Sequence, residues 1–152
     1  MNPSQEIVEK WIGRMAESHH GDPLAALRAP DPDPFRNPVG HTIRRSLAQL
    51  WEQLQGDMDL DAIDSALDAV IRIRAVQDIA PSDAVGFVIQ LRSILRQQPA
   101  GFDLVLLENR IDQLTLAAFD KYMECREQIL AARLHEKERL TRAHRVAGKV
   151  GA

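Results

Sequence analysis

This chain of 152 residues has little of what many protein chemistries require. Its single cysteine, Cys125, excludes an intrachain disulfide framework and a cysteine-rich zinc site. Aromatic residues make up only 5% of the chain, and no apolar run approaches the roughly 20 residues that a membrane-spanning helix needs. The 22 acidic and 19 basic residues give a net charge of −3, which argues against a dedicated nucleic-acid-binding protein.

The N-terminus has no basic patch followed by an apolar stretch, so we expect no secretory signal. Together with the free thiol of Cys125, this predicts a cytoplasmic protein. The length suits one domain of ordinary size. We place that domain at residues 1–138 and a basic helix end or tail at 139–152.

Apolar residues at helical spacing fill nearly the whole chain, and no strand-length alternation interrupts them, so we predict an all-α fold. A proline-rich segment at 29–36 is predicted to be extended, because each proline disfavours the helical conformation of the residue before it. A short helical turn is predicted at 23–27. The longer helices are predicted at 5–17, 37–55, 59–78, 82–98 and 102–147.

The last of these segments, residues 102–147, contains neither glycine nor proline. A single helix of this length would measure roughly 69 Å at 1.5 Å per residue. A domain of this size has a radius of gyration of only about 15 Å. The helix must therefore overhang its domain, break, or lie against a second chain.

Two apolar faces run along this segment at steps of three, four and seven residues. Such a helix is expected to pack its own domain on one side and a partner on the other, which predicts a homodimer; the alternative is a helix that bends inside a monomer. The predicted dimer interface is the first face, up to Ile129. The first face comprises Leu107, Ile111, Leu114, Ala118, Cys125, Ile129 and Ala132, and the second comprises Leu116, Phe119, Met123, Leu130 and Leu134.

Polar side chains interrupt the apolar helix predicted at 59–78. Arg72, Arg74 and Gln77 lie on it, and Ser82 follows at the start of the next helix. We predict these four residues as a binding site for an anionic ligand or a partner's carboxylate. The alternative is structural: Arg74 bonds an internal acid or helix-end carbonyls while Arg72 is solvated.

Two clusters have the residue types of metal sites but not the pattern. Asp57, Asp59 and Asp61 are spaced like the first ligands of a calcium loop, yet Ala62 and Asp68 stand where that loop needs glycine and glutamate. Acids in the first turn of a helix are the simpler interpretation. His19, His20 and Asp22 (residues 19–22) lie in a polar turn without further ligands. We predict no metal.

No histidine lies between His41 and His135, so a haem pocket would lack a proximal ligand on the central helices. A haem- or tetrapyrrole-binding sensor that uses His41 is kept as the alternative function, and we predict no cofactor. No catalytic triad or glycine-rich phosphate loop is present, which predicts that the protein is not an enzyme. Residues 133–149 carry six basic and two acidic side chains, which we interpret as a solvated helix end rather than a nucleic-acid site.

Three stretches of the chain form recognisable motifs: DPFRNPVGHTI at 33–43, a central signature made of IRIRAVQD at 71–78 followed by PSDAVGF at 81–87, and LAAFDKYMECRE at 116–127. Together they resemble one protein family, the N-terminal domain of the RsbRD-type RsbT co-antagonist proteins, which are bacterial stress-sensing regulators. The resemblance covers about Ile7 to Glu138, and the central signature is its most specific part.

This resemblance implies a sensory or regulatory domain of the kind usually joined to a STAS domain or a histidine kinase. It also implies a globin-like helical bundle without haem that dimerises through its last helices. Asp83 and Lys121 depart from the residues expected at these positions. Because the chain ends at Ala152, we expect no output domain after it, so that it signals by binding another regulatory protein of the STAS-domain or kinase type.

Overall fold

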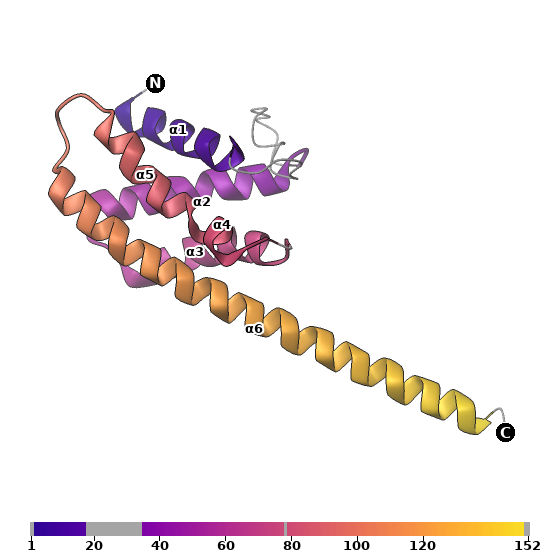
Figure 1. The fold of residues 1–152 in the computed structure, drawn as a ribbon. Helices are drawn as coiled ribbons and strands as arrows, with labels where there is room; N and C mark the ends of the chain where they lie inside the picture. The colour runs from indigo at the N-terminus through magenta and orange to yellow at the C-terminus, as the bar shows by residue number, and fades with distance from the viewer. Residues whose placement is uncertain (1, 18–34, 78, 151–152) are drawn as a thin grey trace.

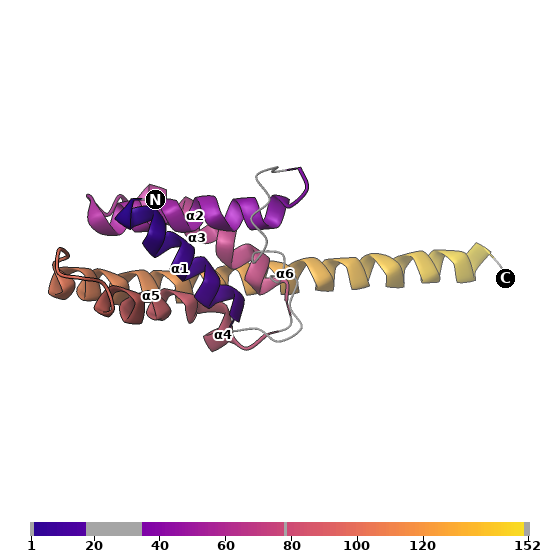
Figure 2. The same ribbon diagram turned by 90° about the horizontal axis from the view of Figure 1, so that it is seen from above.

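The computed structural model describes residues 2–17, 35–77 and 79–150. All regular secondary structure in these residues is α-helical, which confirms the predicted all-α class. Four helices lie against the N-terminal half of the long last helix, and the first helix packs on the second and the fifth (Figures 1 and 2). The helices are α1 (Pro3–Glu17), α2 (Pro38–Gln55), α3 (Leu60–Ala75), α4 (Pro81–Val85), α5 (Phe87–Arg96) and α6 (Leu104–Val150).

Side-chain caps begin two of these helices where the sequence places them. The Asn37 side chain accepts a hydrogen bond from the Gly40 amide at 3.0 Å, and Pro38 occupies the first turn of α2. The Asp59 carboxylate accepts from the amides of Asp61 and Ala62. These bonds satisfy amides that have no partner within the helix. Asp59 is therefore the N-cap of α3, in agreement with the interpretation of this acidic stretch as a helix start.

The helix predicted at 82–98 is two helices, α4 and α5, which meet at Gly86. The Gly86 amide donates to the Ser82 carbonyl at 2.8 Å. A Cβ atom on residue 86 would lie 2.7 Å from that same oxygen, which is closer than ordinary packing allows. The junction therefore requires glycine, and apolar periodicity did not reveal it because the apolar residues continue on both sides.

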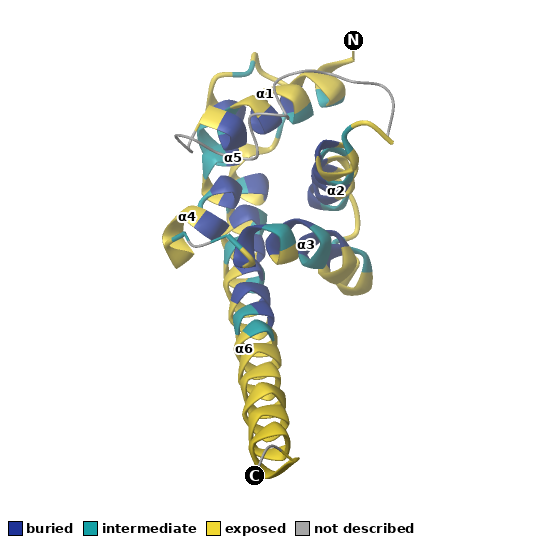
Figure 3. Ribbon diagram, turned by 90° about the vertical axis from the view of Figure 1, so that its right-hand side faces the viewer, coloured by how far each residue is buried: buried dark blue, intermediate teal, exposed yellow. Residues whose placement is uncertain are grey.

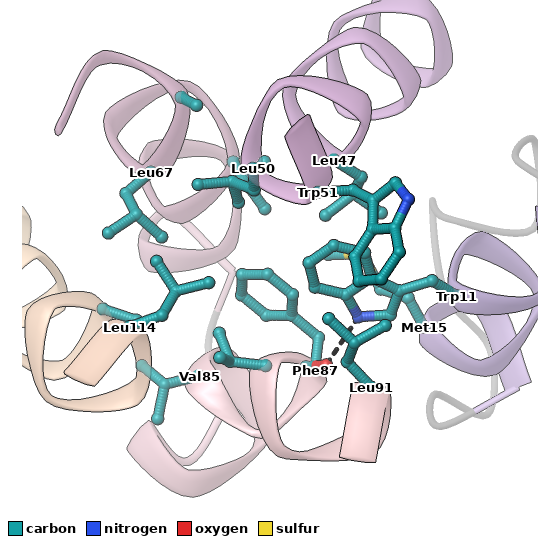
Figure 4. Close-up of a cluster of buried hydrophobic side chains, with 14 of the residues drawn as sticks. Trp11, Met15, Leu47, Leu50, Trp51, Leu67, Val85, Phe87, Leu91 and Leu114 are labelled. Atoms are coloured by element: carbon teal, nitrogen blue, oxygen red, sulfur yellow. Dashed lines mark hydrogen bonds between the residues drawn. The ribbon is translucent and has the colours of Figure 1, made fainter. Parts of the chain in front are cut away.

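One hydrophobic core lies among the six helices. Trp11, Trp51 and Phe87 are its largest apolar side chains, and each is at most 2% exposed (Figure 4). The Trp11 and Phe87 ring centroids are 6.1 Å apart, while Trp51 makes an edge contact with Phe102 at 5.7 Å. The predicted first helix therefore belongs to the domain, because Trp11 fills the centre of its core.

The 47 residues of α6 form one helix about 70 Å long. Its N-terminal half packs on the other helices, and its C-terminal half extends well beyond them (Figures 1 and 2). Of the three outcomes expected for this segment, the helix overhangs its domain. Residues 29–34 of the segment predicted to be extended at 29–36, and the helical turn predicted at 23–27, lie outside the described residues.

Candidate interaction surfaces

The residues predicted as a ligand site do not point to a common place. Arg74 is fully buried, and its guanidinium donates to the backbone carbonyl of Asp83 at 2.7 Å, which joins α3 to α4. Arg72 lies on an exposed side of α3, while Gln77 is partly buried and Ser82 is exposed on α4. The bond from Arg74 to a carbonyl in the last turn of α4 resembles the structural alternative. A ligand site at these four residues stays a prediction.

The first face of α6 packs into the protein's own core. Leu107, Ile111, Leu114, Ala118 and Cys125 are at most 5% exposed, and Ile129 packs against the edge of the same cluster. The domain's own helices therefore cover most of this face, and the dimer interface predicted on it stays a prediction.

The second face of α6 is exposed. Leu116 is 70% exposed and Leu134 is 63% exposed, while Phe119, Met123 and Leu130 lie between 42% and 50%. At 3.6 residues per turn, Met123 lies directly opposite the buried Leu114. The helix thus carries one apolar face inside its domain and a second one in solvent, and contiguous exposed apolar surface marks interaction sites.

The last part of α6 has no tertiary contacts that bury it. Every residue from Leu130 to Val150, a segment that we call the free end, is exposed (Figure 3). At 1.5 Å per residue, the free end measures about 30 Å. Most helices in proteins gain their stability from packing of an apolar face, and the free end has no such packing within its own domain.

Three cationic side chains of α6 attach it to the domain, in roles that the sequence did not predict. Arg110 donates to the carbonyls of Leu54 and Gly56, both at 2.8 Å, at the C-terminal end of α2. Arg126 donates to the carbonyl of Ala75 at 3.0 Å, at the end of α3. Helix ends leave carbonyls without partners and carry partial negative charge, so both arginines cap a neighbouring helix. The basic residue types were visible in sequence, but the helix ends they reach were not.

The third cation is Lys121, which is 7% exposed. Its ammonium lies 2.8 Å from the Asp64 carboxylate of α3 and 3.0 Å from that of Glu124. The hydrogen bond to Asp64 is the main cause that raises the lysine pKa well above its usual range, against the opposing effect of burial. Nearby, Arg72 forms an ion pair with Asp68 at 2.8 Å and donates to the Gln128 side chain at 3.0 Å.

The described residues offer no metal-ligand cluster of three or more His, Cys, Asp or Glu side chains. His41 is exposed and borders a groove of about 600 Å³ between α1 and α2. His135 and His144 lie on the free end, whereas His19 and His20 fall outside the described residues. In the part of the chain that the structure covers, no histidine therefore enters the core to serve as a haem ligand.

Comparison with known proteins decides the family. The model of the RsbT co-antagonist protein rsbRD N-terminal domain matches residues 5–137. The chain belongs to this family. The match includes α1 from Gln5 onward, all of α2 to α5, and the part of α6 that carries both apolar faces. It confirms the resemblance found in sequence. The family is one of regulatory co-antagonist domains of stress signalling.

A curated relative also matches over most of its length. It is an uncharacterized protein of Archaeoglobus fulgidus, 24% identical over 137 residues, which cover 88% of this chain and 84% of the relative. No solved structure matches the chain. Within the described residues, no helix is both long enough and apolar enough to cross a membrane.

Proposed function

We propose that this protein is a non-enzymatic regulatory domain that dimerises through the second face of α6 and relays a signal along that helix. The exposed second face is the observation that carries the proposal. A stress-signalling family supplies the regulatory class. The proposed location is the cytoplasm, and the proposed partner is a STAS-domain or kinase-type regulator.

The way α6 is fastened supports a relay. Arg110, Lys121 and Arg126 attach the helix to α2 and α3 through hydrogen bonds and one ion pair, in which the lysine is buried and the Asp64 carboxylate is exposed. A ligand or partner that shifts α3 therefore moves α6, because the bonded atoms of Asp64 and Ala75 both lie on α3. Interfaces between packed helices have discrete alternative arrangements, so a small shift in the domain can change how two α6 helices pair.

A matched pair of variants tests the dimer. Leu130→Glu places a charge in the second face, whereas Ala132→Glu places the same charge two residues away on the opposite side of the helix. Both sites are exposed and neither contributes to the buried core. By light scattering at micromolar concentration, the wild type and Ala132→Glu should be dimers and Leu130→Glu a monomer. A monomeric wild type contradicts the proposal, and so does a Leu130→Glu variant that dimerises as well as the control.

A further inference from the structure

We infer that the groove between α1 and α2 binds a small amphipathic acid. The acid has a carboxylate at one end, an apolar body, and a hydroxyl or carbonyl oxygen at the other end. The groove has a volume of about 600 Å³, within the range of small-molecule sites in proteins. Its lining comes from residues 2–9 and 41–56, so binding there goes beyond the proposed dimer and does not require it.

Two polar contacts between α1 and α2 bracket an apolar stretch of the groove. Near one end, the Ser4 hydroxyl donates to the Gln55 side chain at 3.4 Å. Toward the other end, the Arg44 guanidinium pairs with the Glu9 carboxylate at 2.6 Å. The apolar lining between these contacts consists of Val8, Ala48 and Trp51. An apolar ligand body bound here would be removed from water on both sides, by α1 and by α2.

Trp51 brings an unsatisfied donor to this lining. It is 2% exposed, and its indole N–H has no hydrogen-bond acceptor within the described residues. The ring nitrogen is directed away from core side chains such as Phe87 and Leu67 (Figure 4). Most buried polar atoms have a partner, because a buried donor without one costs free energy. A ligand oxygen supplies the missing acceptor when the exposed Glu52 and Gln55 side chains that border the groove change rotamer.

The part of the groove nearer the start of α2 is cationic. Glu9 neutralises Arg44, whereas the exposed Arg45 forms no ion pair within the part of the chain that the structure describes. His41 lies one turn before Arg45 on the same side of α2 and also lines the groove. A guanidinium binds a carboxylate through charge-assisted hydrogen bonds. The carboxylate of the ligand therefore belongs at Arg45.

The spacing along α2 sets the length and the polarity of the ligand. The rise from Arg45 to Trp51 is about 9 Å, and the apolar body spans this distance. Glu52 lines the groove next to Trp51 and would repel a second carboxylate there. The oxygen that accepts from the indole is therefore an uncharged hydroxyl or carbonyl group.

The end of α2 that lines the groove is also bonded to α6. Gly56 belongs to the groove lining, and its carbonyl accepts a hydrogen bond from Arg110 of α6 at 2.8 Å. A ligand held between α1 and α2 changes how the end of α2 sits against α6. In the proposed function, on which this step rests, the acid is the signal that α6 relays.

Calorimetric titration with three ten-carbon probes tests the ligand class, below the concentrations at which they form micelles. The probe ω-hydroxydecanoate has both polar ends, decanoate lacks the hydroxyl, and α,ω-decanediol lacks the carboxylate. We expect ω-hydroxydecanoate to bind most tightly, with decanoate about five- to tenfold weaker and the diol at least about tenfold weaker. Absence of binding, or any other order of affinities, would overturn the inference.

Variants of the two polar ends locate the ligand. Arg45→Gln should weaken binding of both acids at least about tenfold and leave the diol unchanged. Arg139→Gln removes the same charge from the exposed free end and should bind as the wild type does. Trp51→Phe should abolish the preference for ω-hydroxydecanoate over decanoate. If Arg45→Gln binds the acids like Arg139→Gln, the carboxylate is not in this groove. Arg45 is exposed, so its loss should not impair folding.

The Leu130→Glu variant separates this site from the proposed dimer. It should bind ω-hydroxydecanoate as tightly as the wild type, because its substitution lies outside the groove. A wild type that is monomeric but binds the acid contradicts the dimer alone, whereas a dimer that binds none of the probes contradicts the site alone. Saturating ω-hydroxydecanoate should also change hydrogen exchange of the amides at 107–113, around Arg110. Unchanged exchange there with the acid bound would contradict its role as a signal.

Discussion

The indole N–H of Trp11 donates a 2.7 Å hydrogen bond to the backbone carbonyl of Phe87 (Figure 4). This buried bond joins α1 to the first turn of α5, just after the Gly86 junction. The other buried indole, that of Trp51, makes no hydrogen bond within the described residues. Both tryptophans therefore pack in the same core, but only the Trp11 indole makes a hydrogen bond there.

We therefore expect replacement of tryptophan by phenylalanine to lower the free energy of unfolding by different amounts at the two positions. Trp11→Phe and Trp51→Phe both remove ring volume, but only Trp11→Phe removes a made hydrogen bond, worth about 1 kcal/mol. We expect Trp11→Phe to lower the free energy of unfolding by about 1 kcal/mol more than Trp51→Phe does. Urea denaturation of both variants measures the difference, and equal losses would show that the Trp11 bond contributes nothing net.

We expect substitution of Gly86 by alanine to lower the stability of the protein, whereas the same substitution at a control glycine should raise it. Gly86→Ala puts a methyl group 2.7 Å from the Ser82 carbonyl oxygen, so the α4–α5 junction must shift, at a cost of about 1–3 kcal/mol. Gly13→Ala lies in the interior of α1 with no atom within 4 Å, and it should stabilise by about 0.5–1 kcal/mol. Thermal unfolding of the two variants checks the signs. A tolerated Gly86→Ala would mean that this junction can open without loss.

The contrast between Gly86 and the helix caps also shows which features of the fold can be predicted from the sequence. Caps at Asn37 and Asp59 act within four residues, so their helix starts were predictable from sequence. The Gly86 junction was not, because its glycine serves a backbone contact inside an unbroken apolar pattern. The same holds for α6: the sequence revealed two apolar faces, but which face the domain covers depends on how α3 and α5 pack, and that information is not local.

Lys121 predicts a pH dependence in the alkaline range. The pKa of Lys121 is raised in the folded state. The ion pair therefore contributes its full stability at pH values below the lysine pKa of the unfolded chain, about 10.4. This contribution falls as the pH rises above that value toward the folded-state pKa. Lys121→Met keeps most of the buried stem without the charge. The stability of the wild type relative to this variant should stay constant from about pH 6 to 9 and fall above about 10.4.

Alkaline titration of other groups affects both proteins and cancels in this comparison. Lys10→Met, which removes an exposed lysine paired with Glu6, controls for the loss of one surface charge. The net effect at neutral pH should be below about 1 kcal/mol, because the carboxylates of Asp64 and Glu124 remain largely in solvent. A difference between wild type and Lys121→Met that does not change with pH would contradict the assigned role of the ammonium.

We expect the free end, residues 130–150, to be stably helical only when the protein is a dimer. Residues from Leu130 onward are not buried in their own domain, and most helical stability in proteins comes from packing of an apolar face, so we expect this segment to open readily when it is unpaired. In the wild-type dimer, we expect hydrogen exchange of the backbone amides at 130–150 to be slowed. In the Leu130→Glu monomer the same amides should exchange close to the rate of an unfolded chain, while those of Leu47 and Leu50 in the core of α2 keep their protection. Ala132→Glu should leave the free end protected, because its charge faces away from the partner. Protection that persists in a monomer would mean that the long helix is stable alone, and the exposed apolar face would then need an explanation other than pairing.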